Sequence, residues 1–436
     1  MTTDLPGTPD LQLVLPTTVG EPVSPSRRVR RRLKKARKLR VAGLFAGIGG
    51  LEEGLRRAHH ETLLLCENDL AARAVLAAKF PHVKSRPKDV TKLNKLPRKT
   101  DLVAAGFPCQ DLSQAGKTAG IAGARSGLVG QVFRLLGLKE DGTVAKTKHR
   151  PKFVLLENVP FMLQLARGEA LNVIVTTLET LGYKWAYRVI DSRAFGVPQR
   201  RERVFLVATL ATLPDEDPRD ILFAEDAGEP GEPKETPRDV ACGFYWTEGT
   251  RGLGWGVDCV PTLKGGSTIG IPSPPAIVMP EGRVVTPGIR DAERLQGFKR
   301  DWTKAAEAVA RKSARWKLVG NAVTVHVAHW IGKQFANPGE YVPRGDVRLY
   351  DGAPWPRAAY NVGSGRFHAN VSSWPVQRRR KPLAKFVKEA TDLSEKAAAG
   401  FLKRARASKL KFEPWFLDTV EAHVDRVRAA RSSAAA

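Results

Sequence analysis

One cysteine stands where a protein can use it for covalent chemistry. Cys109 belongs to the segment GFPCQ at residues 106–110, which directly follows the apolar run of residues 101–105. That run predicts a buried strand, and the Gly and Pro after it predict a tight loop. Because α/β proteins place their chemistry in loops at the carboxyl ends of parallel strands, we expect Cys109 to be a nucleophile held on a rigid turn.

Three charged residues next to apolar strands could act on the same substrate. Glu157 follows the apolar run of residues 153–156, where burial would raise its pKa toward neutrality and suit it to acid or base work. A solvated glutamate at a strand end is the alternative. Arg201 and Arg203 precede the apolar strand of residues 204–208 and have the same parity, so both face one side of an extended segment. Two guanidinium groups on one side suit a planar polar ring or a phosphate.

A glycine-rich turn with an acidic residue downstream predicts a cofactor site. Residues 39–45 form the first predicted strand, and the turn AGIGGL leads from it into a helix that starts at Glu52. This layout brings backbone N–H groups and a helix N-terminus up to a ligand, although glycines also serve ordinary tight turns. Glu67 ends the next apolar strand about 20 residues beyond the glycines, where a carboxylate can bind ribose hydroxyls. The combination predicts a cofactor that contains a nucleoside.

The order of the elements predicts the fold class. Strands and helices alternate from residue 39 to residue 105, which is typical of an α/β protein with a doubly wound parallel sheet and a site at the carboxyl ends of its strands. The glycine-rich segment at residues 111–127 is expected to close over a bound substrate, with an ordinary surface loop as the alternative. Further helices are expected at residues 68–80 (with Asp69 near its start), 128–138 and 171–181, and a strand at residues 185–190.

Composition points to a polyanionic partner. The chain has 436 residues, and 71 Lys and Arg against 45 Asp and Glu give a formal net charge of +26. Such an excess favours nucleic acid as the partner, with charged tails as the simpler alternative. The four cysteines form no CxxC pair, so we expect neither a metal site nor disulfides. Since there is no apolar run long enough to cross a bilayer and no signal peptide, we expect a soluble cytoplasmic protein that does not bind membranes.

The two ends differ in character from the middle. Residues 1–26 are rich in Pro, Thr, Gly and Ser, and residues 27–40 form a basic run that either lies along phosphates or stays solvated. Residues 341–374 are expected to be rich in loops, whereas residues 384–407 and 415–428 have a helical pattern. This C-terminal part either grips DNA phosphates, binds a partner protein or stabilises the fold.

Taken in order, the motifs resemble those of the cytosine-5 DNA methyltransferase family. The resemblance covers residues 39–336. One departure is Asn68, where the family often has a bulkier side chain. The matching motifs are LFAGIGG at residues 44–50, GFPCQ at 106–110, ENV at 157–159, QRRER at 199–203, RDAERLQGF at 290–298 and VGNAV at 319–323.

The resemblance implies that the enzyme methylates carbon 5 of a flipped cytosine in double-stranded DNA, with S-adenosyl-L-methionine as cofactor. It implies that Cys109 attacks carbon 6 and that Glu157 protonates or hydrogen-bonds ring nitrogen 3. Arg203 would hold the exocyclic oxygen, and Arg201 would orient Glu157 or the base. The implied cofactor-binding residues are Phe45, Gly47, Gly49, Gly50, Glu67, Asn68, Asp89, Val90, Phe107, Asn321 and Val323.

DNA-reading residues are expected in the loop after Cys109 and in two loops at residues 251–256 and 262–267, both expected to be exposed. For each residue, a phosphate contact or plain solvation is the alternative to base reading. The candidates are Gln110, Ser113, Arg251, Lys264 and Thr268.

The resemblance also implies a domain order with a Rossmann-like methyltransferase domain and a smaller target-recognition domain. The expected segments are a disordered basic leader at residues 1–38, a catalytic domain at 39–210 completed by 319–336, a recognition domain with its supporting helix at 211–318, and a basic extension at 337–436.

We expect a prokaryotic enzyme that protects self-DNA in restriction-modification or phage defence, with defence-system proteins as further partners. One alternative is an RNA cytosine-5 methyltransferase of the same fold. Another is a non-catalytic DNA-binding module, against which the intact Cys109, Glu157 and Arg203 argue.

Overall fold

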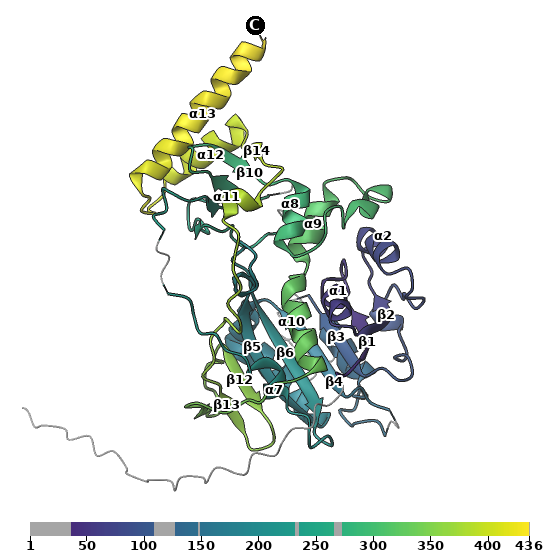
Figure 1. Cartoon of the computed structure of the whole chain (residues 1–436). Coiled ribbons are helices and arrows are strands. Elements are labelled where there is room, and N and C mark those ends of the chain that lie inside the picture. Colours follow the sequence, from purple (N-terminus) through teal and green to yellow (C-terminus); the bar gives the residue numbers. More distant parts are fainter. Residues whose placement is uncertain (1–35, 109–126, 147–148, 232–234, 266–272, 436) are drawn as a thin grey trace, which may run out of the picture. The chain divides into compact units, whose positions relative to one another are not determined.

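Two β-sheets organise the part of the chain that the structure describes. The structure is a computed structural model and describes residues 36–108, 127–146, 149–231, 235–265 and 273–435. Within these ranges, one sheet has nine strands and the other has five. Figure 1 labels strands of both sheets. No helix in the described ranges is long and apolar enough to span a lipid bilayer. The expected DNA-reading and nucleophilic residues Cys109, Gln110, Ser113 and Thr268 lie outside the described residues, as does almost all of the expected lid.

The larger sheet contains the expected parallel strands on one side, whereas the strands beyond β4 pair antiparallel. The parallel strands, in spatial order, are β2 (Glu61–Cys66), β1 (Arg40–Leu44), β3 (Leu102–Gly106) and β4 (Phe153–Asn158). β6 (Glu202–Leu210) pairs antiparallel with β4 and with β5 (Tyr183–Asp191). Parallel neighbours need a crossover of about a dozen or more residues, so the short connection between β5 and β6 produces an antiparallel pair.

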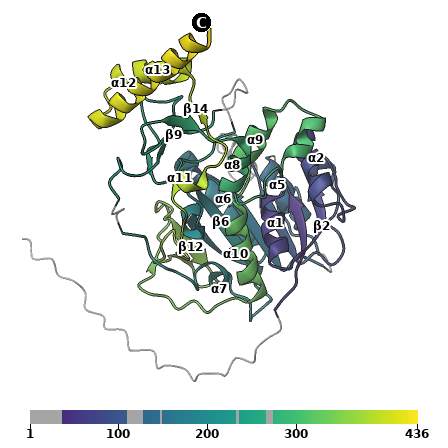
Figure 2. The same ribbon diagram turned by 45° about the horizontal axis from the view of Figure 1, so that its top comes forward.

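Helices cover both faces of this sheet, which is the doubly wound arrangement. Successive strand residues point to opposite faces, so Val41 and Ala42 belong to different cores. One face packs against α5 (Leu128–Leu135) and α6 (Glu169–Thr180). The other face packs against α1 (Gly50–Arg57), α7 (Pro218–Leu222) and α10 (Val325–Ala336), and α1 lies beside α10 in both views (Figures 1 and 2). The predicted α/β, Rossmann-like fold class is confirmed.

Three short strands beyond residue 341 extend the larger sheet. β12 (Ala358–Asn361) pairs antiparallel with β5, β13 (Arg366–His368) pairs with β12, and β11 (Val347–Arg348) forms the edge. Each strand has two to four residues, too few for an alternating pattern to stand out in the sequence. Residues 341–374 are therefore rich in loops, as expected, and these three short strands are the part that the sequence does not indicate.

The smaller sheet takes its strands from two distant parts of the chain. Its strands, in spatial order, are β14 (Thr391–Asp392), β10 (Val284–Thr286), β9 (Ala276–Val278), β7 (Cys242–Phe244) and β8 (Gly256–Val257). β14 lies inside residues 384–407, where the sequence predicts helix throughout, so that prediction is wrong in part. The helical pattern there belongs to two separate helices, α11 (Leu383–Phe386) and α12 (Glu395–Arg406).

The last two helices close the core of the smaller sheet. α12 and α13 (Pro414–Ala435) lie beside the strands of this sheet (Figure 2) and share a core with them. The ring centroid of Phe244 on β7 lies 5.0 Å from that of Phe401 and 5.1 Å from that of Phe416. This packing is what the stabilising role predicts for the C-terminal segment, and contacts with DNA phosphates or with a partner protein stay predictions.

Replacing Phe401 by alanine should destabilise the smaller sheet strongly. Phe401 is fully buried, so Phe401→Ala removes ring contacts and leaves a cavity, at an expected cost of about 3–5 kcal/mol in the free energy of unfolding. Urea denaturation followed by tryptophan fluorescence measures this cost. Lys403→Ala on the exposed side of the same helix is the matched control and should change stability by less than about 0.5 kcal/mol. Equal midpoints for the two variants would contradict the assigned packing.

Candidate active site

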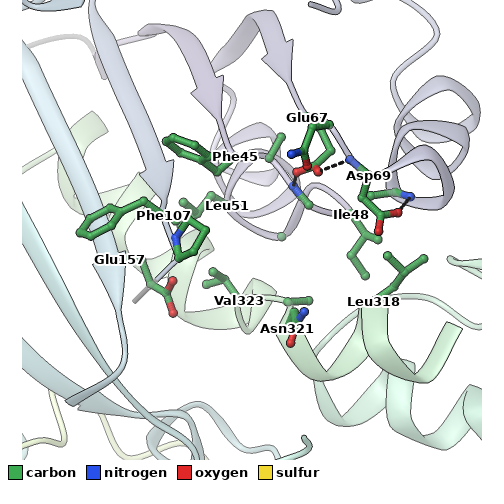
Figure 3. Close-up of a pocket in the computed structure, with 18 of the residues that line it drawn as sticks. Phe45, Ile48, Leu51, Glu67, Asp69, Phe107, Glu157, Leu318, Asn321 and Val323 are labelled. Atoms are coloured by element: carbon green, nitrogen blue, oxygen red, sulfur yellow. Dashed lines mark hydrogen bonds between the residues drawn. The ribbon is translucent and has the colours of Figure 1, made fainter. Parts of the chain in front are cut away.

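A pocket of about 680 Å³ lies at the carboxyl ends of β1, β2, β3 and β4. Its wall also includes residues at the end of α9 (Ala314–Asn321), as Figure 3 shows for Leu318 and Asn321. The volume is in the range of small-molecule and cofactor sites. Ten expected cofactor residues and two expected catalytic residues line it: Phe45, Gly47, Gly50, Glu67, Asn68, Asp89, Val90, Phe107, Asn321, Val323, Glu157 and Arg203.

Two glycines with different tasks shape the turn after β1. Gly47 has a φ of +54°, and a Cβ on it would meet no atom within 4 Å, so its backbone faces open space. Gly49 has a φ of +82° and is the N-cap of α1, but a Cβ on it would lie 2.5 Å from the ring of Phe80. Gly49 packs closely against Phe80 and is not among the residues that line the pocket, and its expected contact with the cofactor stays a prediction.

Two backbone N–H groups hold Glu67 at the pocket wall. Gly47 donates to one carboxylate oxygen at 2.7 Å, and Asp69 donates to the other at 2.8 Å (Figure 3). Each oxygen has a second lone pair, which can accept a hydrogen bond from a ribose hydroxyl. Asp69 is also the N-cap of α2 (Leu70–Lys79), because its carboxylate accepts from the backbone N–H of Ala72. The turn that orients Glu67 therefore also starts the next helix.

The loop that carries Cys109 leaves β3 directly beside Glu157. The register of β3 and β4 pairs Gly106 with Glu157, and a Cβ on Gly106 would lie only 3.2 Å from a carboxylate oxygen of Glu157. The side-chain amide of Asn158 donates to the carbonyl of Phe107 at 3.1 Å and ties the start of the loop to β4. Pro108, the residue before Cys109, lines the pocket.

Glu157, which is buried, and Arg203, which is partly buried, form an ion pair in the pocket wall. Nε of Arg203 lies 3.2 Å from Oε1 of Glu157. Burial raises the pKa of the Glu157 carboxyl, although the positive charges of Arg203 and Arg201 oppose that rise. Burial also lowers the pKa of Arg203, and the charge of Glu157 opposes that change. A raised pKa favours the protonated carboxyl, which is the form that a general acid needs.

Arg201 contacts other groups than those expected. It is buried and donates to the carbonyls of Leu263 at 3.2 Å, Gly320 at 3.1 Å and Ala322 at 2.7 Å. It does not line the pocket, and these hydrogen bonds go to two backbone segments rather than to Glu157 or into the pocket. Arg201 therefore joins the segment after β8 to the turn at the end of α9.

Gln199 extends the same junction. Its side-chain oxygen accepts from the backbone N–H of Leu263 at 2.9 Å, and its side-chain nitrogen donates to the carbonyl of Leu295 at 3.0 Å. Leu295 ends α8 (Ile289–Leu295), and Gln199 also forms an isolated parallel bridge with Val260. Buried polar side chains that are hydrogen-bonded on both sides hold backbone segments in register. Two residues of the QRRER motif, Gln199 and Arg201, thus form a buried connection to the segment after β8.

Arg251 and Lys264 are the expected DNA-reading residues that the structure describes. Arg251 is exposed. Lys264 forms an ion pair with Glu248, and its ammonium lies 3.7 Å from the ring centroid of Tyr245. Leu263 beside it is buried, so the prediction of an exposed loop at residues 262–267 is wrong at that position.

Several residues around the pocket were not found from the sequence. The indole N–H of Trp302 donates to the carbonyl of Ile48 in the glycine turn at 2.9 Å, and Lys317 lies 3.8 Å from the carboxylate of Asp69. Leu318 lines the pocket as well. These residues lie more than two hundred positions from the glycine turn, and no local pattern links the two regions. The nearby GNAV motif was the available signal that this part of the chain returns to the site.

Similarity to known proteins runs along most of the chain. Residues 39–238 match the model of the C-5 cytosine-specific DNA methylase family. A solved structure of a DNMT2 mutant from Spodoptera frugiperda covers 67% of this chain and 98% of its own, with a TM-score of 0.48 and 14% identity. The type II methyltransferase M.PspPI of Psychrobacter sp. (strain TA137) is 30% identical over 69% of this chain and 80% of that protein.

A second relative matches almost from end to end. The type II methyltransferase M2.BsuMI of Bacillus subtilis (strain 168) is 44% identical over 401 residues, which cover 89% of this chain and 99% of that protein. The likeness to this relative therefore extends beyond residues 39–336. The chain belongs to the C-5 cytosine-specific DNA methylase family.

Proposed function

We propose that this chain methylates carbon 5 of a cytosine in double-stranded DNA through a covalent adduct at Cys109, and that it protects self-DNA in a type II restriction-modification system. The observation that carries the proposal is the Glu157–Arg203 pair in the wall of a cofactor-sized pocket that Pro108 also lines. Membership of the family supports the substrate, and the names of the relatives support the type of system.

S-adenosyl-L-methionine fits the residues of the pocket. The backbone of Gly47 faces open space, and the Glu67 carboxylate has lone pairs for ribose hydroxyls. One oxygen of Asp89 accepts from the backbone N–H and the hydroxyl of Thr91, so the other is available for the amine of an adenine. Bound there, this cofactor would supply the methyl group.

Carbon 5 of cytosine is a poor nucleophile and has to be activated. In this proposal, the residues at the ends of β3 and β4 activate it. When the Cys109 thiolate forms a bond to carbon 6, the ring becomes an enamine with a nucleophilic carbon 5. Glu157 gives its proton to ring nitrogen 3 and neutralises the charge that the addition creates. Arg203 donates hydrogen bonds to the exocyclic oxygen. Once carbon 5 carries the methyl group, a base from solvent takes its proton, and the bond between carbon 6 and sulfur breaks with its electron pair leaving on Cys109 as the thiolate. Ring nitrogen 3 returns its proton to Glu157, which restores the neutral aromatic ring.

The cytosine has to leave the duplex to reach this pocket, because its carbon 6 is shielded inside the base stack. In our proposal, residues 39–210 and 319–336 form the catalytic domain, and the smaller sheet with α12 and α13 reads the DNA. The formal net charge of +26 supports a polyanionic substrate.

Bisulfite sequencing of DNA from cells that express the chain tests the activity and reveals the target site. We expect protected cytosines at one sequence for the wild type and none for Cys109→Ala. A duplex with 5-fluorocytosine at that site tests the adduct, because fluorine at carbon 5 blocks the proton loss that releases the enzyme. The wild type should become covalently attached in the presence of cofactor, whereas Cys109→Ala should stay free on a denaturing gel.

Methyl transfer from labelled cofactor to duplex DNA and to tRNA separates the two catalytic alternatives. Label on tRNA alone would overturn the DNA proposal. Binding of DNA without transfer to either substrate would favour a non-catalytic module. Full activity of Cys109→Ala would leave the family assignment in place and remove the adduct mechanism.

A further inference from the structure

One acidic side chain in the pocket wall has no role in the proposed reaction. Glu52 lies in the first turn of α1, lines the pocket and is fully buried. Neither of its carboxyl oxygens has a hydrogen-bond partner in another described residue. Leaving a buried carboxylate in this state is costly, so its presence beside a ligand pocket calls for a physical reason.

The surroundings of Glu52 favour its uncharged form. Burial raises the pKa of the Glu52 carboxyl to about 8, its own backbone N–H opposes the rise, and the negative charge of Glu67 adds to it. Glu53, the next residue, is equally buried but pairs with Arg56 and Arg57 at 2.8 Å. The two neighbouring acids therefore differ in one respect: Glu53 has its counter-charges, and Glu52 has none within the described protein.

The Glu52 side chain fits against β1 because Gly43, the β1 residue that faces it, has no side chain. A Cβ on Gly43 would lie 2.2 Å from Oε1 of Glu52, so the glycine in β1 makes the space that the carboxyl occupies. The carboxyl is thus held between β1 and the pocket rather than turned to solvent.

We propose that Glu52 senses the charge of the cofactor, being protonated when the pocket is empty or holds an uncharged thioether and ionised when the pocket holds a sulfonium. The inference rests on the proposed function. A sulfonium cofactor and its thioether product differ by one positive charge. Coulomb attraction to that charge in a pocket of low dielectric favours the carboxylate, which gives its proton to solvent. Glu52 would thereby favour the substrate form of the cofactor over the product.

Other titratable groups surround the same space and must be separated from Glu52. They belong to β2 and the turn after it, to the segment before β3, to β4, to β6 and to α9. These groups are Cys66, Glu67, Asp69, Lys88, Asp89, Glu157, Arg203 and Lys317. Glu157 is the most important of these groups to separate from Glu52, because burial raises the pKa of its carboxyl as it does that of Glu52.

Isothermal titration calorimetry on the full chain tests the inference without any methyl transfer. S-adenosylmethionine and S-adenosylhomocysteine are titrated into the wild type between pH 6 and pH 8, in buffers with different protonation enthalpies. For the wild type, we expect proton release with the sulfonium alone. The ratio of the two affinities should shift toward the sulfonium by up to about tenfold per pH unit over this range. Glu52→Gln should release no proton and show a ratio independent of pH.

Glu157→Gln is the matched control and should keep the pH-dependent ratio of the wild type. If the ratio of the two cofactor affinities does not change with pH in the wild type, the inference is overturned. This test needs only the wild type and so does not depend on the folding of Glu52→Gln. A pH-dependent ratio that survives in Glu52→Gln would overturn it too. Failure of the wild type to bind S-adenosylmethionine at all would instead remove the proposed function.

Discussion

Arg201→Met is expected to destabilise the chain by about 3–5 kcal/mol, although Arg201 does not line the pocket. The substitution removes the donors of three hydrogen bonds to carbonyls, of which the shortest is 2.7 Å to Ala322. Those carbonyls lie on two segments that Arg201 joins. Urea denaturation followed by circular dichroism measures the loss in the free energy of unfolding.

Arg203→Met is the matched control for this prediction. Arg203 lies two residues further along the same motif but faces the pocket and Glu157. Its replacement should abolish methyl transfer and cost less stability than Arg201→Met, because the Glu157 carboxyl that loses its partner can take up a proton. If Arg201→Met were as stable as the wild type and yet inactive, the structural role that we assign to Arg201 would be wrong and a direct role in catalysis would be favoured.

Glu157→Gln is expected to lower the rate of methyl transfer by about 10²–10⁴-fold, the range for loss of a general acid. The glutamine keeps the size of the side chain but has no proton to give to ring nitrogen 3. Single-turnover kinetics with labelled cofactor measure the rate, and calorimetry should show unchanged cofactor affinity. Glu67→Gln on the opposite wall is the control and should weaken cofactor binding, because it removes a charged acceptor from the expected ribose site.

The pH dependence of the wild type follows from the raised pKa of Glu157. A carboxyl whose pKa is raised keeps its proton to a higher pH than an ordinary glutamate, so the active acid form is present below the raised pKa and is lost as pH rises through it. The single-turnover rate of the wild type should therefore fall on the alkaline side, and Glu157→Gln should lack that limb. An identical alkaline limb in both proteins would assign the titration to another group.

How much of the site could be predicted from the sequence depended on where each residue stands relative to a strand end. Glu67, Phe107 and Glu157 directly end or follow buried strands, and parallel strands bring such residues to one edge, so their placement could be predicted. Arg201 could not be placed in this way. Parity gives the side of a strand but not the partners that a long side chain reaches, which here are carbonyls far away in the sequence.

The same reasoning explains what was missed in the fold. β1, β3 and β4 are apolar runs of five or six residues, which stand out in the sequence. β14 has two residues and pairs with a strand about a hundred positions earlier, so its structure comes from the partner and not from its own pattern. Gly49 illustrates a further limit, because a turn glycine can serve a neighbouring ring as well as a ligand.

The contribution of the C-terminal helices to the smaller sheet has a consequence for the growing chain on the ribosome. All the described residues that line the pocket lie before residue 324, whereas the core of the smaller sheet needs Phe401 and Phe416. The proposed catalytic residues are therefore synthesised before the proposed DNA-reading unit can fold. We expect an incomplete chain to lack sequence-selective activity, because the unit that we propose to choose the target is completed last.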